Sequence, residues 1–92
     1  MDKQWYLANV IWYDGCDAFV SKFVVQVDTV DGERGVTDES KAKLDAYLHG
    51  NGEILKIDLL YDVNFDNILA MKDHTEVPEY QAAFERFKNM WF

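Results

Sequence analysis

The chain has 92 residues, 49% of them apolar and 28% charged, and its 17 acidic side chains outnumber nine basic ones to give a net charge of −8. This length accommodates a single compact domain over residues 1–92 with one modest hydrophobic core. The acidic balance argues against direct binding to nucleic acid, whose phosphates require Lys and Arg, and against anionic membrane surfaces. No apolar run has transmembrane length, and residues 1–20 lack the pattern of a signal peptide. Cys16 is the only cysteine, which indicates a reducing compartment, and we therefore expect a cytoplasmic protein.

The first predicted element is a long antiparallel hairpin. Residues 4–13 and 18–30 are rich in β-branched and aromatic side chains, which is typical of strands. The residues between them, Asp14-Gly15-Cys16-Asp17, form a turn sequence. If the turn centres on Gly15 and Cys16, directly paired residues have numbers that sum to 31. Such pairs share one face of the hairpin, because side chains alternate with a period of two.

A helix is predicted after this hairpin. Gly32 and Gly35 end the second strand, and the helix is expected to run from residue 38 or 39 to residue 49. Thr37 or Asp38 serves as its N-cap and Gly50 as its C-cap. Its narrow apolar stripe consists of Leu44, Tyr47 and Leu48.

The second half of the chain predicts one or two further strands and a second helix. Residues 53–61 are expected to form a strand, and residues 68–72 fit either a short strand or a helical turn. Thr75 caps a final helix that has Pro78 in its first turn. Apolar residues recur there at spacings of three and four, namely Val77, Tyr80, Phe84, Phe87 and Trp91. The expected fold class is α+β, with an antiparallel sheet packed by two helices in the order ββαβ(β)α.

The two faces of the predicted hairpin differ in composition. One face is apolar almost throughout and is assigned to the core; it holds Tyr6, Ala8, Val10 and Trp12 opposite Val25, Phe23, Ser21 and Phe19. The other face mixes large apolar residues with Asn9, Lys22 and Gln26, whereas the solvent face of an antiparallel sheet normally is polar. Either the first helix covers this second face or it meets another molecule, because mixed aromatic and polar composition is typical of interfaces. We predict a partner-binding surface whose apolar members are Trp5, Leu7, Ile11, Tyr13, Val20 and Val24.

The residue types that form active sites in enzymes do not form a catalytic motif in this sequence. Cys16 lies between Asp14 and Asp17, and this negative charge disfavours the thiolate that a nucleophile needs. His49 and His74 have no spacing that resembles a zinc-ligand pair. The glycines fall in turns and build no phosphate-binding loop, and there is no serine nucleophile elbow. We therefore expect a protein that is not an enzyme.

Residues 62–73 place oxygen side chains at several positions of an EF-hand calcium loop. Asn67 stands where the loop requires glycine, and Asp73 stands where it requires a bidentate Glu. A turn rich in Asn and Asp explains the same residues, because these side chains bond to nearby backbone groups. We expect neither a metal nor a cofactor.

The preferred function is that of a non-enzymatic acidic interaction protein, whose partner is a protein with a basic surface. An inhibitor of a protein that handles nucleic acid, of the kind found in phages and plasmids, belongs to this class. Self-association through the same face, giving a homo-oligomer, is a second interpretation of that surface. The alternative from another class is a small ligand-binding or catalytic domain, with a pocket between the sheet and the C-terminal helix lined by Trp12, Tyr47 and Tyr80.

Overall fold

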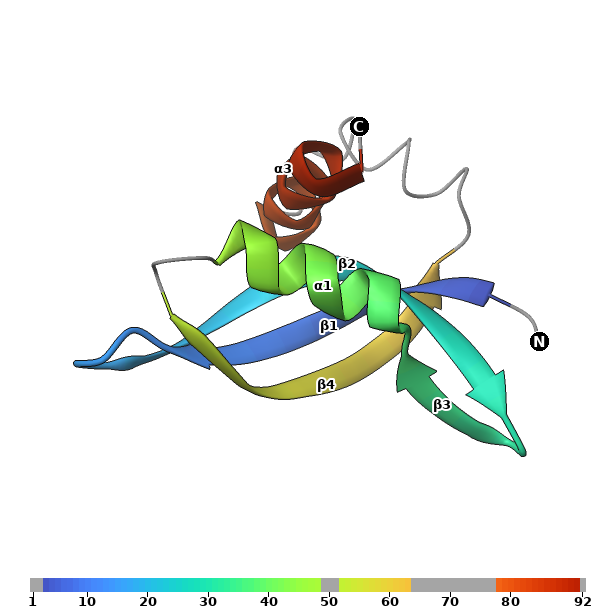
Figure 1. The fold of residues 1–92 in the computed structure, drawn as a ribbon. Helices are drawn as coiled ribbons and strands as arrows, with labels where there is room; N and C mark the ends of the chain where they lie inside the picture. The colour runs from blue at the N-terminus through green and yellow to red at the C-terminus, as the bar shows by residue number, and fades with distance from the viewer. Residues whose placement is uncertain (1–2, 49–51, 64–77, 92) are drawn as a thin grey trace.

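The computed structural model describes residues 3–48, 52–63 and 78–91. Within them the chain forms an antiparallel sheet of four strands and two helices, so the predicted α+β class is confirmed. The order of the strands in the sheet is β3-β2-β1-β4, and the sheet is curled (Figure 1). The elements in chain order are β1 (Lys3–Tyr13), β2 (Ala18–Val30), β3 (Glu33–Val36), α1 (Asp38–Tyr47), β4 (Glu53–Val63) and α3 (Pro78–Trp91).

The long N-terminal hairpin has the predicted register. Pairing between β1 and β2 runs from Lys3 with Asp28 to Tyr13 with Ala18, so that every pair sums to 31. The turn is closed by the backbone N–H of Asp14, which donates to the carbonyl of Asp17 at 3.1 Å. Gly15 has a φ of 94°, a conformation that glycine adopts without steric cost.

β3 is a strand that the sequence analysis missed by ending the second strand at Gly32. β2 and β3 are joined by Asp31 and Gly32, which have φ values of 53° and 83°, and Val30 pairs with Glu33 across them. A two-residue turn with positive φ at both positions matches the twist of a hairpin, and Asp-Gly is a favoured sequence for it. The chain therefore reverses within two residues and adds a third strand. The strand considered for residues 68–72 lies outside the described residues.

The start of α1 is anchored to β2. Thr37 is its N-cap, and its Oγ1 accepts a hydrogen bond from the backbone N–H of Ser40 at 3.0 Å. The Ser40 hydroxyl in turn accepts from the N–H of Gln26 at 2.9 Å, and the N–H of Thr37 donates to the Gln26 carbonyl at 3.2 Å. α1 ends at Tyr47 with Leu48 as C-cap, two residues before the predicted end. The predicted C-cap, Gly50, lies outside the described residues.

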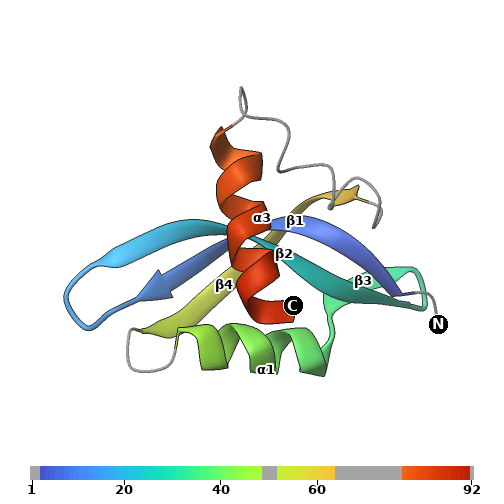
Figure 2. The same cartoon turned by 90° about the horizontal axis from the view of Figure 1, so that it is seen from above.

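Both faces of the β1–β2 hairpin carry a buried apolar cluster. The inner cluster confirms the predicted core face and includes α1 residues; it consists of Tyr6, Ala8, Val10, Phe23, Val25, Val27, Leu44 and Leu48. The outer cluster lies under α3 and consists of Leu7, Val24, Ala83, Phe84 and Phe87. Figure 2 shows α3 crossing β1 and β2 at a steep angle, whereas α1 runs along the sheet. The core-facing role predicted for Phe84, Phe87 and Trp91 is confirmed, while Val77 and the side chain of Tyr80 lie outside the described part.

Two cations join α3 to its neighbours. Lys43 of α1 donates to the Met90 carbonyl at 3.3 Å, and its ammonium lies 4.3 Å from the centre of the Trp91 ring. Arg86 donates to the Lys22 carbonyl at 3.1 Å and also lies over a β2 aromatic ring. Neither described helix is long and apolar enough to cross a membrane.

Candidate functional site at the hairpin tip

Three of the six residues predicted to bind a partner lie beneath α3. Leu7 and Val24 are buried in the outer cluster, and Trp5 is half-buried beside it. The Trp5 ring meets Phe87 edge-on at a centroid distance of 5.1 Å and Trp91 at 4.9 Å. The aromatic stripe of α3 therefore covers this part of the second face. The sequence suggested the first helix as the cover, but α3 provides it.

The other three predicted residues lie beyond a polar row. Lys22 donates to the amide oxygen of Asn9 at 3.0 Å, and this pair separates the residues under α3 from those nearer the turn. Ile11 is half-buried, Tyr13 is 40% exposed and Val20 is 63% exposed. The predicted surface is thus divided, and only the half next to the turn is open to a partner in the described structure.

The opposite face of the same hairpin end also carries aromatic side chains. Trp12 stacks on Phe19 with ring centroids 4.9 Å apart, and its Nε1 donates to the Ser21 hydroxyl at 3.1 Å. Phe19 is 40% exposed, so its assignment to the core was wrong. Phe19 points to the same face of the hairpin as the core residues. It lies too close to the turn, however, for a helix to cover it. Distance from the turn is the sequence signal that could have indicated this exposure.

We call Ile11, Tyr13, Phe19 and Val20 together the tip surface. Figure 1 shows that this end of the β1–β2 hairpin projects beyond α1 and β4. Apolar groups are exposed on both of its faces, because no described helix extends this far along the hairpin.

The turn that ends the tip is ordered by one carboxylate. Oδ1 of Asp14 accepts hydrogen bonds from the backbone N–H groups of Asp17 at 2.8 Å and Cys16 at 2.9 Å. These two bonds hold the pKa of Asp14 below its usual value, and the bond from Asp17 has the larger effect. The Tyr13 hydroxyl donates to the Gly15 carbonyl at 2.9 Å. The tip thus combines exposed apolar groups with two carboxylates on a hydrogen-bonded turn, and the Cys16 thiol is exposed within it.

Several basic side chains are engaged within the molecule. Each of four cations lies over an aromatic ring, at 4.3 to 6.0 Å from its centroid; the pairs are Arg34 with Tyr6, Lys43 with Trp91, Arg86 with Phe23 and Lys88 with Phe84. Lys56 forms an ion pair with Asp58 at 3.2 Å. The turn of the tip carries Asp14 and Asp17, and the β2–β3 hairpin carries Asp31 and Glu33 next to Arg34.

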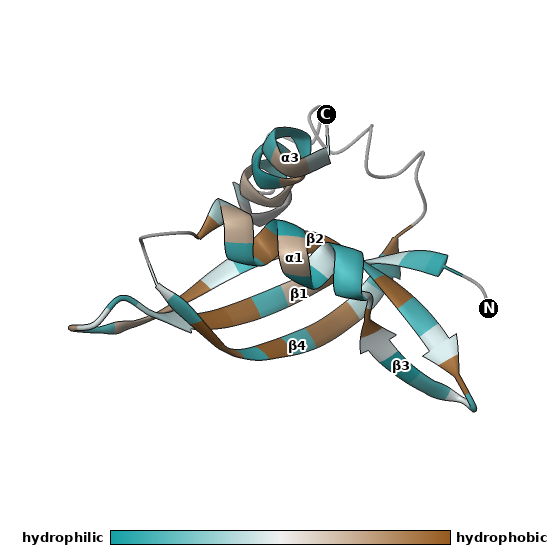
Figure 3. Ribbon diagram, viewed as in Figure 1, coloured by the Kyte–Doolittle hydropathy of each residue, from teal (hydrophilic) through white to brown (hydrophobic). Residues whose placement is uncertain are grey.

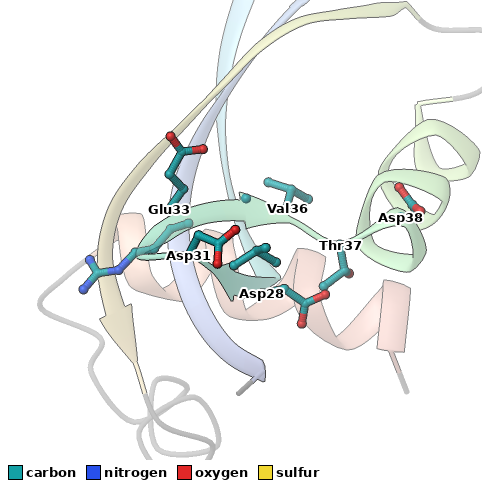
Figure 4. Close-up of a pocket in the computed structure, with 9 residues that line it drawn as sticks. Asp28, Asp31, Glu33, Val36, Thr37 and Asp38 are labelled. Atoms are coloured by element: carbon teal, nitrogen blue, oxygen red, sulfur yellow. The ribbon is translucent and has the colours of Figure 1, made fainter. Parts of the chain in front are cut away.

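The second hairpin end, opposite the tip, forms a hollow of about 490 Å³ that is lined by carboxylates and by Arg34. Figure 4 shows that Asp28, Asp31 and Glu33 come from the β2–β3 hairpin and that Asp38 comes from the start of α1. The Glu33 carboxylate points away from that of Asp28 (Figure 4). Among the described residues, no three His, Cys, Asp or Glu side chains are placed to hold a metal ion.

A further hollow of about 470 Å³ lies between β3 and β4. It is lined by Gly35, Val36, Lys41, Ile54, Leu55, Lys56 and Ile57. Neither hollow is lined by Trp12 or Tyr47, which the alternative prediction placed around a ligand pocket. His49, His74 and residues 64–73 of the calcium-like window lie outside the described residues.

Comparison with known proteins gave no match, since no family model, no curated protein and no solved structure is significantly similar to the chain. Among the described surfaces of the chain, the tip surface combines exposed apolar groups, a projecting shape and negative charge.

Proposed function

We propose that the protein is a non-enzymatic acidic interaction protein that binds a protein partner through its hairpin tip. The observation that carries this proposal is the exposure of Tyr13, Phe19 and Val20 on the two faces of one projecting hairpin end. Large aromatic and aliphatic groups in such a position lose water when a partner closes around them, and they are typical anchors of interfaces.

The order of the tip favours binding further. Asp14 bonds to two backbone N–H groups of the turn, and Trp12 is held by stacking on Phe19 and by its bond to Ser21. A group that is already ordered loses less conformational entropy when it binds. The tip is thus suited to insertion into an apolar groove of the partner.

The charge of the tip and of the whole chain indicates the chemistry of the partner. Asp14 and Asp17 flank the apolar groups, and the chain has a net charge of −8. A groove with basic residues at its rim complements both features, and such complementarity speeds association and selects partners. Proteins that handle nucleic acid have basic surfaces, so an inhibitor of such a protein in the cytoplasm is the specific form of this proposal.

The test uses two double variants of similar chemistry. Tyr13→Ser/Val20→Ser removes exposed apolar groups from the tip, whereas Val30→Ser/Leu60→Ser removes exposed apolar groups from the β2–β3 hairpin and from β4. Each protein is immobilised and the partners that it retains from a lysate are quantified by mass spectrometry. We expect the tip variant alone to lose a basic partner that wild type retains.

The affinity of the purified partner then decides the proposal. By calorimetry, the tip variant is expected to bind about 10- to 100-fold more weakly, as for the loss of anchor residues, while the control variant binds like wild type. Equal affinities of wild type and tip variant would contradict the proposal. Circular dichroism of each variant establishes that the fold is retained.

A further inference from the structure

β4 is an edge strand that leaves apolar groups at the margin of the sheet. It pairs with β1 on one edge, and no other described strand pairs with its second edge. Leu55 is 56% exposed and Leu60 is 43% exposed. Figure 3 shows hydrophobic and hydrophilic residues alternating along this strand. The inner cluster also reaches solvent here, through partly buried Ile54, Ile57 and Leu59.

The pairing of β4 with β1 is irregular at two points and regular between them. Register shifts occur opposite Leu7/Ala8 and opposite Ile11/Trp12, which leaves Leu60 and Leu55 as the additional residues. Between these bulges, Lys56–Leu59 pairs continuously with Ala8–Ile11. Bulges protect the ends of an edge strand from pairing, whereas a regular stretch remains available as a template. A further strand would therefore pair with the middle of β4.

We propose that the occupant of this edge is β4 of a second copy of the chain, paired antiparallel about a two-fold axis at Ile57. This register places Lys56 opposite Asp58 of the second copy, and the symmetry repeats the pair. Lys56 and Asp58 share one face of the sheet, because they are two residues apart. Opposite charges directly across an antiparallel pair stabilise it, and like charges destabilise it.

The neighbouring symmetric registers lack this complementarity. An axis at Asp58 would oppose two carboxylates, and an axis at Lys56 would oppose two ammonium groups. An axis between two residues would bring residues of the inner face opposite residues of the outer face, because the side-chain period is two. The charge pattern of the regular stretch therefore selects the axis at Ile57.

In the monomer, Lys56 and Asp58 pair with each other, and both can pair with the second copy instead. Within one chain, Nζ of Lys56 lies 3.2 Å from Oδ1 of Asp58, and the two side chains are 66% and 41% exposed. Exposed pairs of this kind contribute little to folding stability, so both groups are available for pairs between copies. The register also brings exposed Leu55 near Leu59 of the second copy.

Charge reversal tests both the dimer and its register. We expect wild type to dimerise reversibly in sedimentation equilibrium at concentrations up to about 1 mM, which covers weak association. Lys56→Glu places like charges opposite each other twice, as does Asp58→Lys, so each single variant is expected to raise the dissociation constant about tenfold or more. The double variant Lys56→Glu/Asp58→Lys restores opposite charges and is expected to dimerise like wild type. Lys3→Glu, on an exposed residue of β1, is the control for Lys56→Glu, because both substitutions change the net charge by the same amount.

Disulfide cross-linking tests directly whether the two-fold axis lies at Ile57. In a Cys16→Ser background, Ile57→Cys brings two thiols opposite each other and is expected to form a disulfide-linked dimer under oxidation, because directly opposed Cβ atoms are about 5 Å apart. Leu55→Cys lies opposite Leu59 of the second copy and is expected to give no such product.

The outcomes separate this proposal from the one for the tip. A wild-type protein that remains monomeric at about 1 mM overturns the proposal, as does a dimer that neither single charge reversal weakens. A dimer that is lost in Tyr13→Ser/Val20→Ser but kept in Lys56→Glu would place self-association at the tip and overturn the β4 pairing. Thermal unfolding at low protein concentration shows whether each variant keeps its fold.

Discussion

At the scale of single residues, Gly52 lies too close to Trp12 and Tyr13 for a residue with a Cβ atom. A Cβ atom on Gly52 would lie 2.5 Å from the Trp12 ring and 2.6 Å from the Tyr13 carbonyl oxygen. No side chain fits at these distances, so the chain enters β4 across the face of Trp12 only because residue 52 is glycine. The same contact supports the stacked pair of Trp12 and Phe19 at the base of the tip surface.

Gly52→Ala is therefore expected to lower the free energy of unfolding by about 1–3 kcal/mol, the usual cost of forcing an additional group into a packed site. Gly35→Ala is the matched control, because a Cβ atom at Gly35 meets nothing within 4 Å. We expect the control to be neutral or slightly stabilising, since glycine is unfavourable within a strand. Urea unfolding of both variants measures the difference, and equal stabilities would contradict the packing argument.

Asp14 gives the tip turn a dependence on pH. Its carboxylate accepts two backbone N–H bonds in the folded protein, and these lower its pKa relative to the unfolded chain. A lowered folded pKa means that the stabilising effect is present above the unfolded pKa and is lost as the pH falls through the folded pKa. We expect the amide signals of Cys16 and Asp17 in NMR spectra to titrate together, with a midpoint below the ordinary value for Asp. A midpoint at or above that value would show that these bonds are not kept in solution.

At the scale of elements, α3 determines which part of the hairpin is interior. Its Phe87 is 1% exposed and meets Trp5 edge-on, and Ala83 and Phe84 complete the cover over Leu7. Without this helix, Trp5, Leu7 and Val24 of the outer face would be exposed. With it, the apolar residues of this face that remain exposed beyond the Asn9–Lys22 pair lie at the tip.

Phe87→Ala is expected to cost about 3–5 kcal/mol of unfolding free energy, as for other buried aromatic residues. That is a large share of the total stability of a small domain, about 5–15 kcal/mol. Asn89→Ala changes an exposed position of the same helix and should leave stability nearly unchanged. Guanidinium unfolding followed by Trp fluorescence distinguishes the two, and a small effect of Phe87→Ala would mean that α3 is not docked.

At the scale of the whole molecule, the distribution of charge is uneven. Several of the nine basic side chains lie over aromatic rings, while Asp14 and Asp17 at one hairpin end and Asp31 and Glu33 at the other are exposed. Cations held in this way add packing, and the chain as a whole keeps its net charge of −8. The negative net charge would attract the basic partner proposed above, and it makes the folded chain repel itself.

This repulsion predicts that salt stabilises the protein. Raising the NaCl concentration from about 0.02 M to about 0.2 M shortens the screening length from roughly 20 Å to roughly 7 Å. We expect the free energy of unfolding to rise by about 1 kcal/mol, because repulsion between carboxylates across the molecule is reduced. KCl at equal ionic strength should have the same effect, which separates screening from the binding of one ion. A decrease in stability with salt would mean that attractive pairs dominate instead.

The sequence by itself determined most of the local structure. The β-branched and aromatic residues of 4–13 and 18–30 predicted both strands, and a turn centred on Gly15 and Cys16 predicted their register. The spacing of Phe84, Phe87 and Trp91 predicted a core-facing helix. β3 was also within reach of sequence reasoning, since Asp31-Gly32 has the residue types that a two-residue turn requires.

Only the tertiary structure decided which positions along each face of the hairpin are covered by a helix. Trp5 and Tyr13 have the same parity on β1, yet α3 packs against Trp5 and leaves Tyr13 exposed. Parity assigns a side chain to a face, whereas burial depends on where along that face a distant helix lies. The six predicted partner-binding residues were therefore divided by the docking of α3, and Phe19 joined the tip surface from the opposite face. The docking of α3 over Trp5, Leu7 and Val24 has no local signal in the sequence, because it arises from contacts between segments some 60 residues or more apart in the chain.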